Sequence, residues 1–411
     1  MKKKIILTIG DGLGDRPCKE LDYMTPLEYA HTPNLDRLAK TGATGIMDLI
    51  GPGIPLGTDI GHMILFGYAQ EDYPGRGPIE ASGAGLSLEP GDVAFRCNFA
   101  TVDEAFNVID RRAGRIRENT HILANSLDGM EIDGVKILFK EATEHRAVLI
   151  LRGEGLSANI TDSDPKKIDG NTKYKEVLST DGKADSIYTA NILNKFLLEA
   201  NKILKDHQVN KERIDNGKLP ANFILTRGAG IMPNIPKITE KLNFKASCVA
   251  AEGTVLGVAR LAGFNPVSHE EMTGNIDTNI ELKAKKVIEE LEHSDFVALN
   301  LKCPDLMGHD GKPKKKAEAI ELFDQLIGNI LEYKPENTII AIAADHSTPC
   351  EKKEHSGDPV PILINGPGVR RDNVERFNEI DCGHGGLGRI KGHEFIWTLY
   401  DYLELIKKEG N

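Results

Sequence analysis

Aspartate and histidine residues recur in four short segments, each placed directly after a predicted strand or in the loop that follows one. The segments are GDGLGD, CPDLMGHD, AADHSTP and KEHSGDPVP. Carboxylates and imidazoles in this number suit two divalent cations, and mixed oxygen and nitrogen ligands favour manganese, zinc or a similar ion over calcium. A single histidine after a strand is more often an ordinary loop residue, so the set of segments carries the prediction. The candidate ligands are Asp11, Asp305, His309, Asp345, His346 and His355.

A hydroxyl group in the segment PLGTDIGHM is the candidate nucleophile. Thr58 follows Gly57 and precedes the apolar segment Ile60 to Phe66, so it stands where a helix N-cap would. One interpretation is that Thr58 only caps this helix. The other is that a metal lowers the pKa of the hydroxyl group and makes it a nucleophile, while the helix N-terminus favours the phosphate that it would acquire. The metal cluster favours the second interpretation.

Short apolar runs that alternate with amphipathic segments indicate an α/β fold. Ile5 to Ile9 is a buried strand that ends at Asp11, and Thr32-Pro33 begins a helix that ends at Gly42. In a parallel sheet the carboxyl ends of the strands share one edge, so the candidate ligands are expected to converge there. Further on, the sequence predicts helices over 280–291, 317–333 and 393–405 and strands over 296–301, 338–343 and 361–364.

The middle of the chain has the pattern of an inserted, mixed α+β domain. From about residue 76 a turn-rich stretch leads into the short segments VAFRCNFATV, VKILFK and AVLILRG, and a long helix is predicted from about 187 to 204. The polar segment 207–220 is interpreted as a connection back to the first domain, although a return anywhere between 205 and 240 fits the pattern. The predicted domains are 1–75 with 218–411, and 76–217.

Composition excludes several classes of function. The 411 residues carry a formal net charge of −11, which disfavours general binding to nucleic acids or anionic membranes. No apolar run is long enough to span a membrane, and the run after Lys4 is too short for a signal peptide. The six cysteines show no paired spacing, so neither a disulfide framework nor a structural zinc site is expected. This cysteine pattern predicts a protein of the cytoplasm. Oligomeric state leaves no mark in the sequence.

A basic cluster in the predicted insertion stands out in this acidic chain. The segment IDRRAGRIR holds Arg111, Arg112, Arg115 and Arg117. Arginine suits bidentate recognition of phosphate and carboxylate groups, so these residues are candidates for binding an anionic substrate. The alternative is a solvated positive face. Arg96 and Arg146 are further candidates from the same insertion.

Several segments, in their order along the chain, resemble the alkaline phosphatase superfamily and, more narrowly, the cofactor-independent phosphoglycerate mutases of the archaeal type. They are GDGLGDRP, TPNLDRLA, GTDIGH, YPGRGPIEASGAG, DRRAGRI, PDLMGH, ADHSTP, EHSGDPVP and GHGGLGRIKGHEF. The resemblance implies a phosphatase-like α/β domain with helices on both faces of a parallel sheet, interrupted by a domain that closes over the substrate. It also implies one metal ion held by Asp305, His309 and His355, and a second held by Asp11, Asp345, His346 and Thr58.

The activity implied by this resemblance is the interconversion of 3-phosphoglycerate and 2-phosphoglycerate in glycolysis and gluconeogenesis, through a phosphorylated Thr58. Manganese is the expected metal, with zinc, cobalt or magnesium as alternatives. Neither 2,3-bisphosphoglycerate nor a nucleotide is expected, because the chain lacks a Walker lysine motif and a dinucleotide fingerprint. Related bacterial mutases have serine in an N-S-E-x-G-H context where this chain has GTDIGH, and the added methyl group leaves less room. His62 matches that motif without being a usual ligand.

Other functions fit the same metal-binding scaffold. A homoserine-kinase-like transferase would require a nucleotide, and a plain phosphatase would release inorganic phosphate. A phosphopentomutase would use the same two metals. A non-catalytic metal-binding protein would be expected to lack a ligand or the hydroxyl group, yet all seven candidate residues are present. The acid and base that act on the glycerate hydroxyls remain unassigned by sequence.

Overall fold

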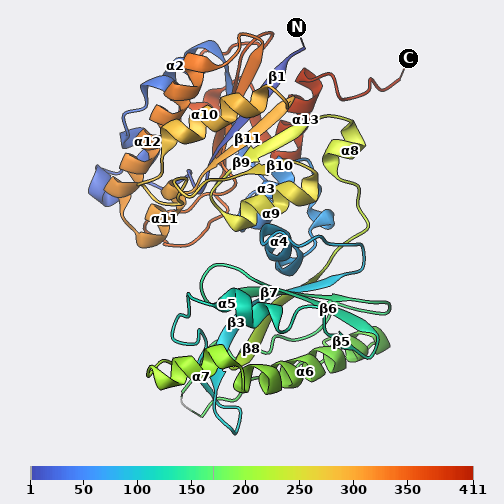
Figure 1. Ribbon diagram of the computed structural model, residues 1–411. Helices are drawn as coiled ribbons and strands as arrows, with labels where there is room; N and C mark the ends of the chain where they lie inside the picture. Colours follow the sequence, from blue (N-terminus) through green and yellow to red (C-terminus); the bar gives the residue numbers. More distant parts are fainter. Residues whose placement is uncertain (1, 170, 411) are drawn as a thin grey trace. The chain divides into compact units, whose positions relative to one another are not determined.

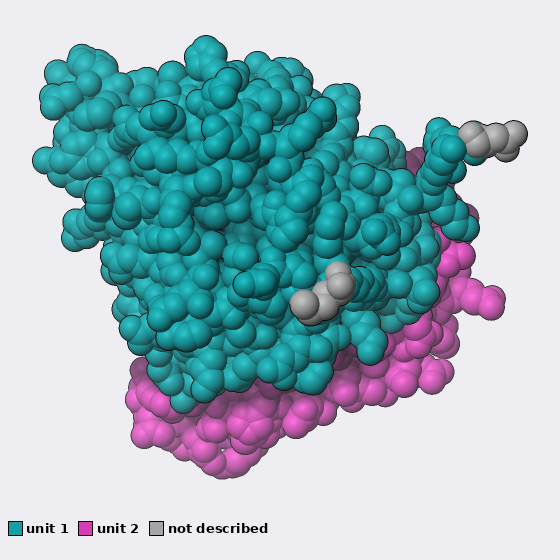
Figure 2. All heavy atoms as spheres, turned by 90° about the horizontal axis from the view of Figure 1, so that it is seen from above, with its two compact units in different colours: residues 1–73, 236–411 teal, residues 74–235 magenta. Residues whose placement is uncertain are grey.

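The computed structural model describes residues 2–169 and 171–410, and the chain divides into two compact units. Unit 1 comprises residues 1–73 and 236–411 and unit 2 comprises 74–235, coloured teal and magenta in Figure 2. The predicted return to the first domain at 218 is therefore too early. Strand β8 (Phe223–Ile231) pairs with β3 (Val93–Val102) and belongs to unit 2. The segment interpreted as a polar connection contains helix α7 (Gln208–Asp215).

The sheet of unit 1 has eight strands among the described residues, in the order β10-β9-β11-β1-β12-β13-β2-β14. Figure 1 labels four of them, β10, β9, β11 and β1. Its centre, from β9 through β11 and β1 to β12, is parallel. These strands are continuous buried apolar runs, as parallel strands covered on both faces should be. The strands are β1 (Lys4–Gly10), β2 (Ala43–Asp48), β9 (Ala246–Val249), β10 (Asn265–Val267), β11 (Phe296–Leu301), β12 (Thr338–Ala343), β13 (Val360–Asn365) and β14 (Gly388–Lys391).

One strand departs from the expected parallel sheet. Strand β13 is antiparallel to both β12 and β2. Parallel neighbours need a long crossover, commonly a helix, whereas the segment 344–359 between β12 and β13 contains no helix among the described residues. The chain therefore returns beside β12 in the opposite direction. The predicted strands 296–301 and 338–343 are confirmed with the same bounds.

Two groups of helices pack on the sheet of unit 1. In one, α2 and α10 both contact α12, and in the other, α3 contacts both α9 and α13. The predicted helix 280–291 is confirmed, the one expected from 317 begins earlier, at Pro313, and the last ends at Tyr402. The helices are α1 (Pro26–Tyr29), α2 (Pro33–Thr41), α3 (Thr58–Leu65), α8 (Ile238–Leu242), α9 (Gly253–Ala262), α10 (Ile280–Leu291), α11 (Cys303–Asp310), α12 (Pro313–Tyr333) and α13 (Gly392–Tyr402), with 3-10 turns η1 (Lys19–Leu21), η2 (Gln70–Asp72) and η3 (Cys382–His384).

Unit 2 is an antiparallel sheet with a long helix. Its strands follow the order β4-β3-β7-β6-β5, and β8 also pairs with β3. Helix α6, predicted at 187–204, extends over Ala184–Lys205. The remaining elements are α4 (Arg76–Gly83), β4 (Val108–Asp110), α5 (Thr120–Asn125), β5 (Glu131–Ile132), β6 (Val135–Glu141) and β7 (Arg146–Arg152).

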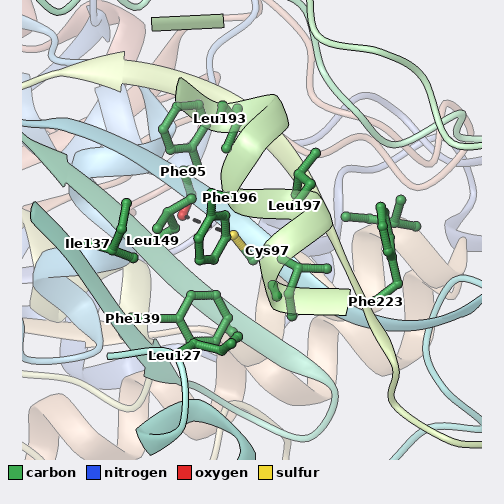
Figure 3. Packing of buried hydrophobic residues seen from close by; sticks show 14 of the residues in the cluster. Phe95, Cys97, Leu127, Ile137, Phe139, Leu149, Leu193, Phe196, Leu197 and Phe223 are labelled. Atoms are coloured by element: carbon green, nitrogen blue, oxygen red, sulfur yellow. Dashed lines mark hydrogen bonds between the residues drawn. The ribbon is translucent and has the colours of Figure 1, made fainter. Parts of the chain in front are cut away.

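The core of unit 2 lies between this sheet and α6. Alternate residues of β3, among them Phe95 and Phe99, face the core with Phe139 of β6, and α6 contributes Phe196 (Figure 3). The Phe139 ring centroid lies 5.9 Å from that of Phe99 and 6.0 Å from that of Phe196. On the other face of the sheet, Ala94, Val148 and Ile150 pack with Ala81 of α4 in a second, smaller hydrophobic cluster. Within the described chain, no helix combines the length and apolar character needed to cross a bilayer.

A buried carboxyl group makes the stability of unit 1 depend on pH. Glu379 is partly exposed as a residue, but its carboxyl group accepts hydrogen bonds from the Asp15 backbone N–H (3.2 Å) and the Thr25 hydroxyl (2.8 Å), and burial raises its pKa to about 7. Between pH 4.5 and 7 the folded state keeps a proton that the unfolded state has released, so the free energy of unfolding falls as pH rises through this window.

We expect the Glu379→Gln variant to lose this decrease of the free energy of unfolding with pH. Above pH 7 the variant should be more stable than the parent protein by about 2 kcal/mol. Denaturant unfolding at pH 5 and pH 8 measures the effect. The exposed Glu375→Gln is the control and should leave the pH dependence as it is. Equal stability of the parent protein at both pH values would contradict the prediction.

Candidate metal centre

The candidate ligands of unit 1 gather at the carboxyl edge of the parallel strands. Asp11 follows β1, and Asp345 and His346 follow β12, its hydrogen-bonded neighbour. On the other side of β1, strand β11 runs directly into α11, which carries Asp305 and His309. The sequence thus places these residues together because three adjacent parallel strands end at one edge.

Three of the ligands form a compact triangle. The Asp305 Oδ1 atom lies 3.5 Å from His309 Nε2 and 3.4 Å from His355 Nε2, and the two imidazole nitrogens are 3.1 Å apart. Two ligand atoms about 2.1 Å from a tetrahedral ion are separated by about 3.4 Å, so one divalent cation fits among the three atoms. This is the first ligand set that the resemblance implied.

The second set surrounds His346. Its Nε2 atom lies 3.6 Å from Asp11 Oδ1, 3.2 Å from Asp345 Oδ2 and 3.3 Å from Thr58 Oγ1. Asp11, Asp345 and His346 are all buried. The structure therefore brings together all seven candidate residues, in the two groups expected.

The imidazole rings of the first set are oriented by backbone carbonyl groups. His309 Nδ1 bonds Lys353 O (3.1 Å), and His355 Nδ1 bonds Leu56 O. A ring that donates its Nδ1–H to a carbonyl leaves the Nε2 lone pair free, which is the arrangement typical of metal-bound histidine. Both Nε2 atoms point to Asp305, as described above.

Thr58 is the first residue of α3 rather than its N-cap. Gly57 takes the cap position, and the Thr58 hydroxyl makes no capping hydrogen bond. The hydroxyl instead faces His346 and Lys302, each 3.3 Å away. Gly61 allows α3 to lie close against the backbone at Asp345, because a Cβ atom at position 61 would lie 2.6 Å from the carbonyl oxygen of Asp345. The capping interpretation of Thr58 is therefore wrong.

Lys302 is a member of the site that the sequence analysis missed. Its ammonium group bonds Asp11 Oδ1 (2.8 Å) and Asp305 Oδ2 (2.7 Å) and so bridges the two ligand sets. Burial alone would lower the pKa of Lys302, but the charges of Asp11, Asp305 and Asp345 raise it overall. Its position just after β11, at the same sheet edge as Asp11, is a signal that could have identified it.

Three further polar residues support the ligands and the nucleophile. Asn300, the penultimate residue of β11, donates through Nδ2 to Asp11 Oδ2 (3.0 Å) and lies 3.1 Å from His62 Nε2. The Nδ1 atom of His62 bonds the carbonyl oxygen of Thr58 (2.8 Å), so His62 supports the start of α3. Thr348 donates its hydroxyl to Asp305 Oδ1 (2.6 Å). Only His62 among these was singled out from the sequence.

The residues present fit divalent cations. Burial and the charge of Asp345 raise the pKa of Asp11, because carboxylates crowd together at this edge of the sheet. The buried Asp345 Oδ2 atom accepts no hydrogen bond within the described chain. An orphaned buried carboxylate oxygen is costly unless a cation binds it. The oxygen and nitrogen donor set suits zinc, manganese or a similar ion.

The predicted arginine cluster of unit 2 divides into separate environments. Arg111 forms a bidentate ion pair with the buried Asp164 (2.8 and 2.7 Å), so its guanidinium group is committed to the fold and the substrate-binding prediction is not supported for it. Arg112 and Arg115 are exposed in the turn after β4. Arg117 pairs with Glu144 at the surface.

Arg96 and Arg146 lie on one face of the sheet with a third arginine that sequence reasoning missed. Arg96 is opposite Arg227 in the β3–β8 register, and Arg146 is opposite Asn98 in the β3–β7 register. Arg96 and Asn98 are two residues apart on β3, so their side chains share one face of the sheet, the face away from the core. The residues opposite them, Arg227 and Arg146, lie on the same face. Burial lowers the pKa of Arg96, and although Glu80 opposes this, the charges of Arg76, Arg146 and Arg227 lower it further.

The Arg111–Asp164 pair predicts a loss of stability rather than of substrate binding. In Arg111→Ala, Arg227, 3.6 Å away, is the one cationic partner that the buried Asp164 carboxylate keeps among the described residues. We expect a loss of about 2 to 3 kcal/mol in the free energy of unfolding, because a buried charge is left with a weaker partner. Chemical denaturation measures it, and Arg117→Ala is the exposed control. A variant as stable as the parent would contradict this role.

Comparison with known proteins identifies the family. A family model described as 2,3-bisphosphoglycerate-independent phosphoglycerate mutase matches residues 39–210. Curated proteins of that name are 49% identical over 415 residues in Pyrococcus abyssi, covering 100% of both chains, and 46% identical over 413 residues in Methanobrevibacter smithii, covering 99% of this chain and 100% of the relative. The solved cofactor-independent phosphoglycerate mutase of Thermoplasma acidophilum has a TM-score of 0.76 at 36% identity, covering 98% and 100% of the two chains. The chain therefore belongs to the 2,3-bisphosphoglycerate-independent phosphoglycerate mutases.

Proposed function

We propose that this protein interconverts 3-phosphoglycerate and 2-phosphoglycerate through a phosphorylated Thr58, without 2,3-bisphosphoglycerate. The observation that carries the proposal is the position of the Thr58 hydroxyl, which lies 3.3 Å from His346 Nε2 and 3.3 Å from Lys302 Nζ within the candidate metal centre. A hydroxyl group held among cations and freed from a capping role is suited to attack a phosphoryl group. Family membership favours phosphoglycerate over other phosphorylated substrates.

The residues of unit 1 would act on the phosphoryl group. Lys302 offsets negative charge beside the Thr58 oxygen, and the N-terminus of α3 lies at the same oxygen because Thr58 is the first helical residue. Asn300 and His62 fix Asp11 and the start of the helix, so the nucleophile is held in position before the substrate binds. The first half of the reaction transfers the phosphoryl group to Thr58, and the second returns it to the other hydroxyl of the bound glycerate.

Two divalent ions, proposed to be manganese, would be held by the two ligand sets. Asp305, His309 and His355 would hold one ion, and Asp11, Asp345, His346 and Thr58 the other. When bound, such ions lower the pKa of a coordinated hydroxyl and neutralise charge on the oxygens of the transferring phosphoryl group. No nucleotide takes part in this reaction. The six free cysteines, all buried, agree with a reducing cytoplasm as the compartment.

The arginine face of unit 2, defined as Arg96, Arg146 and Arg227, would bind the anionic groups of the substrate. The Arg96 guanidinium makes no hydrogen bond or ion pair with another described residue, so it is available to a carboxylate or phosphate. Burial lowers the pKa of His145, and the charges of Arg146, Arg112 and Arg96 lower it further. Arg112 therefore lies near the same charged groups and adds positive charge beside this face. Arg115 lacks such a contact among the described residues.

We expect Arg96→Ala to raise the KM for 3-phosphoglycerate by about 10- to 100-fold, because a charge-assisted hydrogen bond contributes about 1.5 to 3 kcal/mol. Steady-state kinetics measures the change. Arg117→Ala is the matched control, since its guanidinium group is exposed and pairs with Glu144. A KM that Arg96→Ala leaves unaltered would remove this face from substrate binding.

Phosphorus NMR on the metal-stripped protein tests the proposed function. The protein is given 3-phosphoglycerate, then manganese, with no nucleotide and no bisphosphoglycerate. The appearance of 2-phosphoglycerate only after manganese, without inorganic phosphate accumulating, is the expected result. Inorganic phosphate as the sole product would mean a phosphatase instead, and no reaction would mean that another substrate is recognised.

A further inference from the structure

A second group of metal-binding side chains lies in unit 1, built from residues outside the two ligand sets. The side chains of Asp15, Cys18 and Cys350 are all buried, and each offers one ligand atom such that the three atoms lie within 4.8 Å of one another. The Cys18 thiol lies 3.8 Å from Asp15 Oδ1. Asp15 and Cys18 precede η1, and Cys350 follows β12, so only the folded chain brings them together.

The spacing suits a tetrahedral soft cation. Two thiolate sulfurs at about 2.3 Å from a zinc ion lie about 3.8 Å apart, and a sulfur and a carboxylate oxygen lie slightly closer. The Cys18 Sγ atom lies 3.8 Å from Asp15 Oδ1, close to these values, and no two of the three ligand atoms are more than 4.8 Å apart. Three protein ligands leave the fourth position for water or another small ligand.

Charge also balances in this buried site. The Asp15 Oδ2 atom bonds the ammonium group of Lys316 at 2.9 Å, and both side chains are fully buried. Two thiolates and one carboxylate carry three negative charges, against two positive charges from a divalent ion and one from Lys316. A buried group of charges is tolerated when it is neutral overall and hydrogen-bonded. Glu379, which accepts the Asp15 backbone N–H, is largely neutral below its pKa of about 7.

Binding a cation here would displace few hydrogen bonds. The Asp15 carboxylate also accepts backbone N–H groups of Arg16 (2.7 Å) and Cys350 (3.1 Å), which keep it oriented. The Cys18 thiol lies 3.3 Å from the Arg16 carbonyl oxygen and 3.8 Å from Asp15 Oδ1, and a metal would replace these hydrogen bonds because metal binding removes the thiol proton. Lys316 also bonds the carbonyl oxygens of Gly14 and Thr348, so it stays in place.

A cavity adjoins the two cysteines. This cavity, of about 520 Å³, is lined by Cys18 and Cys350 together with exposed charged residues that include Lys19, Glu20 and Glu351. The pair is therefore accessible to a hydrated ion although each cysteine is at most 2% exposed. An entry path is one of the requirements for a metal site.

We propose that Asp15, Cys18 and Cys350 form a third, thiolate-rich site for a soft divalent cation such as zinc. The site would join the loop after β1, which carries Asp11, to the loop after β12, which carries His346. A disulfide is the competing use of two adjacent cysteines. A disulfide would use only the two sulfurs, whereas a cation would also use the Asp15 carboxylate, whose oxygen lies in the same group of ligand atoms, so the metal site is favoured.

Cobalt is the probe that separates this site from the catalytic one. Only a thiolate gives a sulfur-to-cobalt charge-transfer band in the near ultraviolet, and the catalytic ligand sets contain no sulfur. We expect the reduced, metal-stripped protein to develop this band on titration with Co²⁺, saturating at one equivalent of sulfur-bound metal. Cys18→Ala and Cys350→Ala should each lose most of the band, and Cys382→Ala, a buried cysteine elsewhere in unit 1, should retain it.

Thermal unfolding verifies that each variant is folded, and the parent protein alone can refute the proposal. No charge-transfer band at several equivalents of Co²⁺ would overturn it, as would a band that survives in both alanine variants. Loss of two titratable thiols after treatment with a small-molecule disulfide, with no cobalt band beforehand, would assign the pair to redox chemistry instead. None of these outcomes depends on mutase activity, so the third metal site and the proposed function are tested independently.

Discussion

Thr58→Ala is expected to abolish mutase turnover, lowering kcat by on the order of 10⁴-fold or more, because no other group replaces a removed nucleophile. The hydroxyl group sits between His346 and Lys302 and makes no capping bond, so its loss should leave α3 intact. Phosphorus NMR of the conversion of 3-phosphoglycerate measures turnover, and calorimetric titration with manganese measures metal binding. The variant keeps Asp11, Asp345 and His346, so it should still bind metal.

Thr58→Ser is the matched control for this experiment. Serine keeps the hydroxyl and lacks only the methyl group, and it should retain mutase activity. Mass spectrometry of protein quenched during turnover should locate the phosphoryl group on residue 58 in both the parent and the serine variant. Turnover in Thr58→Ala above about 1% of the parent rate would exclude Thr58 as the nucleophile.

Much of the metal centre was predictable from sequence because it depends on strand ends. Asp11 and Asp345 immediately follow apolar runs that could only be buried strands, and parallel strands align their carboxyl ends. Lys302 occupies the same kind of position after β11, but a lysine offered no metal-ligand chemistry and was passed over. Its role as a bridge between carboxylates depends on distances that only the folded chain supplies.

The errors have a common physical origin in long-range pairing. Strand β8 was missed because its run, FILTRGAGI, ends in glycines and an arginine, whereas its pairing with β3 determines which unit it joins. The ion pair of Arg111 leaves no mark in its own segment, because the partner, Asp164, is 53 residues away. Local patterns predict elements well, but they do not show which distant carboxylate neutralises a given arginine.

Metal removal is expected to abolish phosphoglycerate interconversion and to destabilise unit 1. Without divalent ions, Lys302 is the cation that bridges the buried Asp11 and Asp305, and Asp345 Oδ2 accepts no hydrogen bond among the described residues. A cation that binds only the folded state stabilises it by about 4 kcal/mol at 1,000 times its dissociation constant. Thermal unfolding with a chelator and with manganese should show a clear rise in Tm with metal, and manganese should restore activity.

Lys302→Met makes this prediction quantitative. In the metal-free protein the variant loses the bridge between two buried carboxylates, and we expect a loss of about 3 kcal/mol in the free energy of unfolding. Manganese should narrow the difference between variant and parent, since the ions then supply the positive charge that the lysine provided. Lys314→Met, which removes an exposed lysine on α12, is the control. A Lys302→Met defect of equal size with and without manganese would show that the lysine and the metals do not neutralise the same carboxylates.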